Sequence, residues 1–308
     1  MTRATCSIAL ITVFVGGQLP PPQPRFAAKI DLVRLEVMVD RNDEAVAGLT
    51  AGDFSVADNG IPVSGVSVRE FADESFDMVL VVQPFASHGG DQVSLFERSV
   101  RTLFAAIKTS DRFGVVLAAQ PPVRSRVLGV GAIPFDRQAL EGTPHAVLFD
   151  ALGAALTEFD GNDRRKVVLV IADGVDRLSA ITEGMLAPLA AVSQPKVVFL
   201  GVSPTLVDAL KFRRTVSAGS SKTELVGARY KNSFPGEALR AVAENTGGRI
   251  VDLRDLAPEP AVTRLIARLR SGYILTFPPS TTKGWHPVSV KVNQRGANVF
   301  TRAGYFVD

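Results

Sequence analysis

The chain has 308 residues, of which 46% are hydrophobic and 21% charged, and its formal net charge is only +3. This is the composition of an ordinary globular protein, and the length allows one large domain or two modest ones with a sizeable core. The basic clusters 164–166 and 211–214 are short, so we expect solvated faces there and no nucleic-acid partner.

The first residues have the pattern of an export signal. Arg3 gives a positive start, residues 8–15 are mostly apolar, and residues 16–17 are small and suited to cleavage. We therefore expect a signal peptide over 1–17, a Pro-rich linker over 18–28, and a mature protein that is exported, either periplasmic or secreted. The apolar run is shorter than the roughly 20 residues that span a bilayer, so no membrane insertion is expected after signal removal. A membrane-anchored or disordered tail is the alternative.

The only cysteine, Cys6, lies inside this leader. The mature chain would then contain no cysteine, which excludes disulfides, thiol catalysis and cysteine-ligated metals. No later segment of the sequence is long and apolar enough to cross a membrane.

Two segments, residues 29–71 and 271–308, have the patterns of β structure. In the first, apolar and polar residues alternate around residues 35–39, which predicts a strand with one buried face. The pair Asn59-Gly60 lies between alternating apolar runs and predicts a hairpin, because both turn positions tolerate positive φ.

In the second β segment, apolar residues at strand period precede residues 293–296, which predict a turn. Residues 299–306 are expected to complete a hairpin with the strand before that turn. Two or three strands alone are marginal in water. We therefore predict that the early and late segments pair as one sandwich-like domain, with the residues between them inserted as a second domain.

The central residues, 72–270, alternate short apolar strands with amphipathic helices. Apolar residues at helical spacing lie between the strands and again near the end, where Pro258 starts the last helical stripe. This alternation predicts an α/β fold with a doubly wound, mostly parallel sheet. The runs expected as strands covered on both faces are 78–82, 115–118, 167–171 and 197–200.

The strand 78–82 and the residues after it resemble the first strand of a von Willebrand factor type A domain, which ends in the metal-binding loop Asp-x-Ser-x-Ser. The resemblance spans roughly residues 29–308 and implies the fold more than the function, because members are mostly uncharacterised. Further stretches resemble bacterial exported proteins with a von Willebrand factor A-related domain: Gly48–Phe54, Asp58–Gly60, Leu239–Arg249, Leu269–Tyr273 and Arg302–Tyr305.

The resemblance also implies where a metal would sit. In type A domains a magnesium ion lies above the strand ends, held by the Asp-x-Ser-x-Ser loop, a threonine and a further aspartate. The matching positions here are Gln83, Phe85, Ser87, Ala146 and Asp173. Only Ser87 and Asp173 keep a ligand type, and magnesium needs near-octahedral oxygen coordination. We therefore expect a degenerate site that holds no metal, and no other cofactor.

Signatures of enzymes are weak in this sequence. His88 and His145 suit a transition metal, but no ligand spacing supports one, so solvated loops are favoured. Asp173 and Asp176 suit acid–base chemistry, but the sequence places no nucleophile beside them, and capping of a turn or helix is favoured. Dinucleotide, phosphate-loop and nucleophile-elbow motifs are not matched.

The sequence therefore predicts a non-enzymatic, exported protein-interaction module of the adhesion type. We expect a protein partner at the loops above the strand ends, where doubly wound folds place their ligand sites. The alternatives are a hydrolase on the same scaffold that uses Asp173 with His88 or His145, and a structural component of the envelope. The residues predicted to contact the partner are Pro84, Phe85, Ser87, His88, Asp173 and Asp176.

Overall fold

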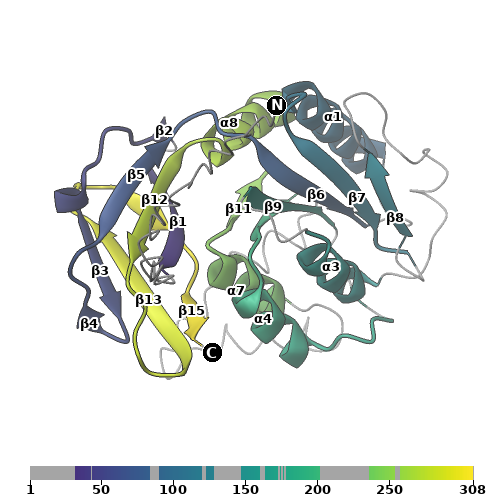
Figure 1. The fold of residues 1–308 in the computed structure, drawn as a ribbon. Helices are drawn as coiled ribbons and strands as arrows, with labels where there is room; N and C mark the ends of the chain where they lie inside the picture. The colour runs from purple at the N-terminus through teal and green to yellow at the C-terminus, as the bar shows by residue number, and fades with distance from the viewer. Residues whose placement is uncertain are drawn as a thin grey trace, which may run out of the picture. The chain divides into compact units, whose positions relative to one another are not determined.

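Two antiparallel sheets, one mostly parallel sheet and the helices beside it make up the described part of the chain (Figure 1). The computed structural model describes residues 32–42, 44–83, 90–119, 123–127, 147–159, 164–172, 174, 176, 178–201, 236–253 and 257–307. For residues 90–93, 123–127, 201, 236 and 252 it describes the backbone alone. Within these ranges, none of the helices has the length and apolar character needed to cross a membrane.

The two antiparallel sheets form the sandwich-like domain, and both combine strands from the early and late segments. One has the order β14-β1-β12-β5, with β2 beside β1, and the other has the order β15-β13-β3-β4. The early and late segments therefore fold together, as the sequence predicts. The strands are β1 (Val33–Arg41), β2 (Glu44–Ala45), β3 (Phe54–Asp58), β4 (Ile61–Pro62), β5 (Ser67–Phe71), β12 (Gly272–Phe277), β13 (Gly284–Val292), β14 (Asn298–Phe300) and β15 (Gly304–Val307).

The hairpin predicted at Asn59-Gly60 is present. β3 and β4 pair antiparallel with Asp58 opposite Ile61. The backbone φ is +48° at Asn59 and +79° at Gly60, so both turn residues lie in the left-handed region that a tight two-residue hairpin requires.

The hairpin predicted over residues 299–306 is confirmed only for its second half, which pairs with β13. This stretch forms two strands in different sheets, because β14 pairs with β1 and β15 pairs with β13. Between them the chain is held by the α/β domain: Ala303 donates its N–H to the carbonyl of Asn245 at 3.1 Å. Arg302 donates to the carbonyls of Ala191 and Ser193 at 2.8 and 2.7 Å. Strand period alone does not show which sheet a strand joins.

The α/β domain contains a sheet of order β11-β10-β9-β6-β7-β8. All neighbours in it are parallel except β8, which is antiparallel to β7. The four predicted apolar strands are all present. The strands are β6 (Phe76–Val82), β7 (Arg112–Leu117), β8 (Val123–Val127), β9 (Arg165–Ile171), β10 (Lys196–Gly201) and β11 (Arg249–Asp252).

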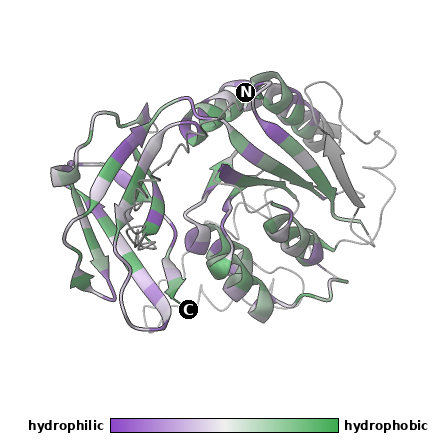
Figure 2. Ribbon diagram, viewed as in Figure 1, coloured by the Kyte–Doolittle hydropathy of each residue, from purple (hydrophilic) through white to green (hydrophobic). Residues whose placement is uncertain are grey.

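Helices cover both faces of this sheet (Figure 1). α1 (Gly90–Ala106) and α8 (Pro258–Leu269) pack on one face, and α3 (Leu148–Thr157), α4 (Glu183–Val192) and α7 (Gly236–Thr246) pack on the other. The central strands are therefore buried along their length and largely green in Figure 2, whereas hydropathy changes from residue to residue along the sandwich strands.

Strand β1 is buried on both faces, which differs from the predicted single buried face. Leu35 and Val37 face the sandwich core, as the alternation predicts. On the opposite face, Met38 and Asp40 are only 5% and 4% exposed, because Met38 packs into the core of the α/β domain. β1 therefore belongs to the sandwich by its hydrogen bonds and to both cores by its side chains.

A buried ion network joins β1 to the starts of the parallel strands. Arg165 of β9 donates two hydrogen bonds to the carboxylate of Glu36, at 3.0 and 2.6 Å, and Lys196 of β10 lies 3.7 Å from the same carboxylate. Burial opposes the ionisation of Glu36, but the charges of Arg165 and Lys196 outweigh it and hold the pKa of this carboxyl below its usual value. Four residues further along β1, the carboxylate of Asp40 pairs with Arg249 of β11 at 2.9 Å.

The solvated face predicted for residues 164–166 is therefore wrong. Arg165 is 5% exposed, with its guanidinium stacked 4.0 Å from the ring centre of Phe71. Lys166 is 7% exposed and donates to the side chain of Gln194 at 2.9 Å. Arg164 pairs with Asp77 at 2.6 Å. These basic side chains form ion pairs and hydrogen bonds within the protein, because β1 and neighbouring strands cover the start of β9.

Replacement of Glu36 by Gln is expected to lower the free energy of unfolding by about 3 kcal/mol, because Arg165 and Lys196 would stay buried without their counter-charge. Lys196→Met is the matched variant and is expected to be close to neutral at pH 7, since the pair with Arg165 survives. Urea unfolding of both proteins measures the difference. Equal losses in the two variants would contradict the central role of Glu36.

The charge of Lys196 also predicts a dependence on pH. Burial lowers the pKa of Lys196 from 10.5 to about 8, against the attraction of Glu36, so between these values the folded state binds fewer protons than the unfolded state. The free energy of unfolding of the wild type, relative to Lys196→Met, should therefore rise as the pH rises from 8 to 10.5. Urea titrations across this window test the sign. A flat difference would mean that the pKa of Lys196 is not lowered in the folded state.

Candidate functional site

The reversal of strand order places Gln83 at the topological switch point of the parallel sheet. β6 has β7 on one side and β9 on the other, so the chain leaves β6 in one direction and returns on its opposite side. Gln83 directly follows β6, is fully buried, and donates its N–H to the carbonyl of Ile171 at the end of β9 at 3.0 Å. Doubly wound folds bind ligands at this position.

The side chain of Gln83 ties two of the loops at this edge together. Its Oε1 accepts the N–H of Gly174, at 3.3 Å and away from solvent. Type A domains, by the resemblance given above, use this position for the first carboxylate that holds a metal. A neutral amide whose oxygen already accepts a backbone N–H does not fit that role, because magnesium favours charged oxygen ligands and sheds its waters reluctantly.

Asp176, in the loop after β9, caps a helix from another part of the sheet. Its Oδ1 accepts the N–H of Phe149 at 3.1 Å and the hydroxyl of Ser179 at 2.6 Å. Ser179 in turn accepts the N–H of Asp150 at 3.0 Å. These N–H groups belong to the first turn of α3, where a carboxylate also meets the positive end of the helix dipole.

The capping is reciprocal. Asp150, in the first turn of α3, accepts the N–H groups of Ala180 and Ile181 at 3.0 and 2.8 Å. The loop between β9 and α4 therefore holds the start of α3, and α3 holds the loop. Sequence reasoning identified Asp176 as a polar residue near a strand end, but it missed Asp150 and Ser179. The signal for Asp150 was an acidic residue in the first turn of a predicted helix, whereas Ser179 lies in a loop and has no such signal.

Of the predicted site residues, Gln83 and Asp176 lie in the described part of the chain. The structure places Gln83 between the ends of β6 and β9, and Asp176 at the start of α3. The others lie outside the described residues: Pro84, Phe85, Ser87, His88, His145, Ala146 and Asp173. Among the described residues, no group of three or more His, Cys, Asp or Glu side chains is placed to hold a metal ion.

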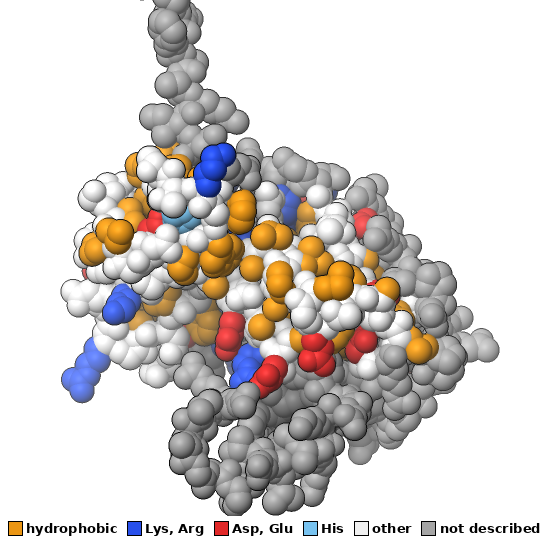
Figure 3. All heavy atoms as spheres, turned by 90° about the horizontal axis from the view of Figure 1, so that it is seen from below, with side chains coloured by type: hydrophobic (Ala, Val, Ile, Leu, Met, Phe, Trp, Pro, Cys, Tyr) orange, Lys and Arg blue, Asp and Glu red, His pale blue; other side chains and the backbone are white. Residues whose placement is uncertain are grey.

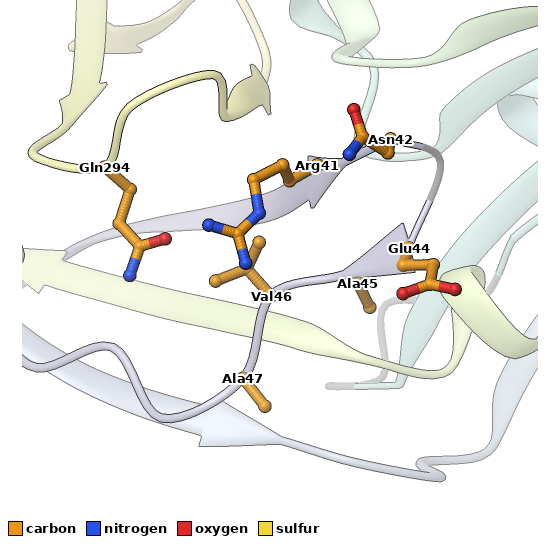
Figure 4. Close-up of a pocket in the computed structure, with 7 residues that line it drawn as sticks. All are labelled: Arg41, Asn42, Glu44, Ala45, Val46, Ala47 and Gln294. Atoms are coloured by element: carbon orange, nitrogen blue, oxygen red, sulfur yellow. The ribbon is translucent and has the colours of Figure 1, made fainter.

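A pocket of about 370 Å³ lies in the sandwich-like domain at the hairpin between β1 and β2 (Figure 4). The side chains of Arg41 and Gln294 point toward each other across it, whereas Glu44 points away. None of its lining residues is a nucleophile or a histidine, so the pocket gives no support to a hydrolase. The lining is Arg41, Asn42, Glu44, Ala45, Val46, Ala47 and Gln294.

Comparison with solved structures gives distant likenesses to type A domains. A von Willebrand factor type A protein from Catenulispora acidiphila aligns with a TM-score of 0.43 and 10% identity, over 92% of this chain and 76% of that one. An aerotolerance-related membrane protein from Bacteroides fragilis aligns at 0.41 and 15%, over 63% and 98%. Proximal thread matrix protein 1 from the mussel byssus, with a zinc-occupied metal site, aligns at 0.40 and 15%, over 71% and 50%.

No protein-family profile and no curated protein matches the chain. The fold assignment rests on the structure itself: a parallel sheet that reverses its strand order between β6 and β9, with helices on both faces. This is the doubly wound α/β fold that the sequence predicts, inserted in a domain built from the early and late segments of the chain. The distant likenesses add nothing on function.

Asp176→Ala is expected to lower the free energy of unfolding by about 1 kcal/mol, because the N–H of Phe149 and the hydroxyl of Ser179 lose their acceptor. Asp176→Asn keeps an oxygen at the same place and should lose much less. Urea unfolding separates the two variants. If Asp176 contacts a partner through its charge, the Asn variant will bind that partner more weakly while keeping its stability. If both variants lose the same stability, the charge itself is needed for the cap.

Proposed function

We propose that this protein is a non-enzymatic, exported interaction module whose partner is another protein. The partner binds the loops above the carboxyl ends of the parallel strands, and the family metal takes no part. The predicted contacts are Pro84, Phe85, Ser87, His88, Asp173 and Asp176, in the loops that follow β6 and β9.

The observation that carries this proposal is the burial and hydrogen bonding of the Gln83 side chain. A residue at the switch point of a doubly wound sheet is placed where ligands bind. Here that residue is a buried amide that closes a hydrogen bond between two loops, at 3.3 Å from the N–H of Gly174. The bond supports a role for this edge as a fixed surface. The amide also stands where a metal site of this family would have its first carboxylate.

No described contact favours the other candidate functions. A hydrolase would need Asp173 with His88 or His145, and a purely structural envelope component would rely on the sandwich-like domain. Asp176, a described carboxylate in the loop after β9, already accepts two hydrogen bonds as a helix cap. These bonds hold its carboxylate at the start of α3, away from a role as general base.

Loss of the metal site predicts that the wild-type protein binds neither magnesium nor manganese at millimolar concentration. The triple variant Gln83→Asp, Phe85→Ser, Ala146→Thr restores the ligand types of the family and is expected to bind magnesium. It should also melt at a higher temperature when the ion is added, because a ligand that prefers the folded state stabilises it. Calorimetry and thermal melts of both proteins measure this, and binding by the wild type would sink the degenerate-site hypothesis.

Photo-crosslinking tests the partner surface. A photoreactive amino acid at position 85 of the full-length protein, expressed in the native host, is expected to crosslink one protein in the envelope fraction. Position 61 is the matched control, because Ile61 is an exposed apolar residue, 69% exposed, on β4 of the sandwich-like domain. The same products from both positions, or none from position 85, would overturn the proposed surface.

A further inference from the structure

After its first residue, Glu183, helix α4 has no charged or polar side chain, even on the side that faces solvent. Leu186 and Ala190 are fully buried against the sheet, but Met185 and Val192 are 57% and 60% exposed. Pro188, also exposed, lies between them at helical spacing, so these three side chains form an outward stripe. A helix that is apolar all round is normally buried on all sides, and an exposed apolar stripe of this kind marks an interaction surface.

The stripe continues beyond the helix. Leu178, in the loop that leads into α4, is 44% exposed. We call Leu178, Met185, Pro188 and Val192 the α4 face. Figure 3 views the molecule from the side on which α4 and α7 lie in Figure 1. It shows hydrophobic side chains across this surface and, along one edge of them, acidic side chains with a basic one among them.

Among the residues that the structure describes, the charges beside the α4 face are mainly acidic. Helix α7 lies next to α4, with the side chain of Asn245 donating to the carbonyl of Ala187 at 3.2 Å. Glu183, Glu237 and Glu244 of these two helices are exposed. The bounds of the two helices contain one basic residue, Arg240, and it is half-buried. This local excess of negative charge stands in a chain of net charge +3.

The basic side chain at the far end of α4 is turned inward. Arg302 donates to the carbonyls of Ala191 and Ser193, at 2.8 and 2.7 Å, where it also suits the negative end of the helix dipole. Burial lowers the pKa of this guanidinium. Arg302 therefore keeps its charge but directs its hydrogen bonds to the end of α4 itself.

We propose that the α4 face docks an amphipathic segment of a partner protein, in which apolar side chains are flanked by Lys and Arg. The apolar residues of the segment cover Met185 and Val192, and its cations lie along Glu237 and Glu244. This surface lies on the helix layer and is distinct from the strand-end loops of the proposed function. Complementary charge favours this occupant. A second copy of the chain would bring two acidic flanks together, and an anionic membrane would be repelled.

A displayed library of random peptides, selected on the full-length protein, tests the chemistry of the occupant without a known ligand. Selected peptides are expected to combine apolar residues with Lys or Arg and to bind more weakly as salt is raised. The double variant Met185→Ser, Val192→Ser should bind them about tenfold more weakly, because exposed anchors at a contact carry most of its affinity. Ile61→Ser, on the sandwich-like domain, is the matched control and should leave binding unchanged.

The charge is tested separately by Glu237→Gln, Glu244→Gln, which keeps the apolar stripe even if the serine variant unfolds. It should weaken binding several-fold at low salt and lose this difference at high salt. Selected peptides without basic residues, or peptides that bind both double variants as well as the wild type, would overturn the proposal. So would dimerisation through this face in sedimentation velocity, or binding to vesicles of anionic lipid that the serine variant abolishes.

Discussion

The half-buried carboxylate of Glu36 is the constraint on which the arrangement of this protein depends. It joins β1, a strand of the sandwich-like domain, to Arg165 and Lys196 at the starts of two neighbouring parallel strands. Asp40 repeats the contact with Arg249 on the next strand. Ion pairs of this kind are directional, and a shift of β1 by one residue would bury all these charges without partners. Because β1 also pairs with β12 and β14, the late segment is fixed by the same contacts.

The elements of the fold were largely predictable from the sequence, whereas their partners were not. Apolar runs predicted the parallel strands, and Asn59-Gly60 predicted its turn, because these signals are local. The burial of Arg165 depends on Glu36, 129 residues away in the chain, and composition around residue 165 resembles any exposed basic cluster. The division of residues 299–306 between two sheets likewise depends on hydrogen bonds from Arg302 and Ala303 to the α/β domain.

In the candidate site, too, the positions of residues were predictable from the sequence and their hydrogen-bond partners were not. The position of Gln83 after the first parallel strand followed from pattern and resemblance, and so did the loss of a carboxylate there. Its hydrogen bond to Gly174 did not, since that bond depends on how two loops approach each other. Asp176 was predicted near the edge, and capping was the favoured role. Its target is the first turn of α3, which precedes it in the chain, and not a helix that follows it. Such caps across loops leave no fixed spacing in a sequence.

The segment between β9 and α4 is held by hydrogen bonds from several parts of the protein. It is held at Gly174 by the amide of Gln83, at Asp176 and Ser179 by the start of α3, and at Ala180 and Ile181 by Asp150. A bound ion would hold such loops by attracting carboxylates; here neutral and capping hydrogen bonds hold the segment at several points along its length. Its first bond lies at the strand-end edge and its end leads into the α4 face. This segment, held at these described residues by internal hydrogen bonds, therefore connects the two surfaces on which we propose that partners bind.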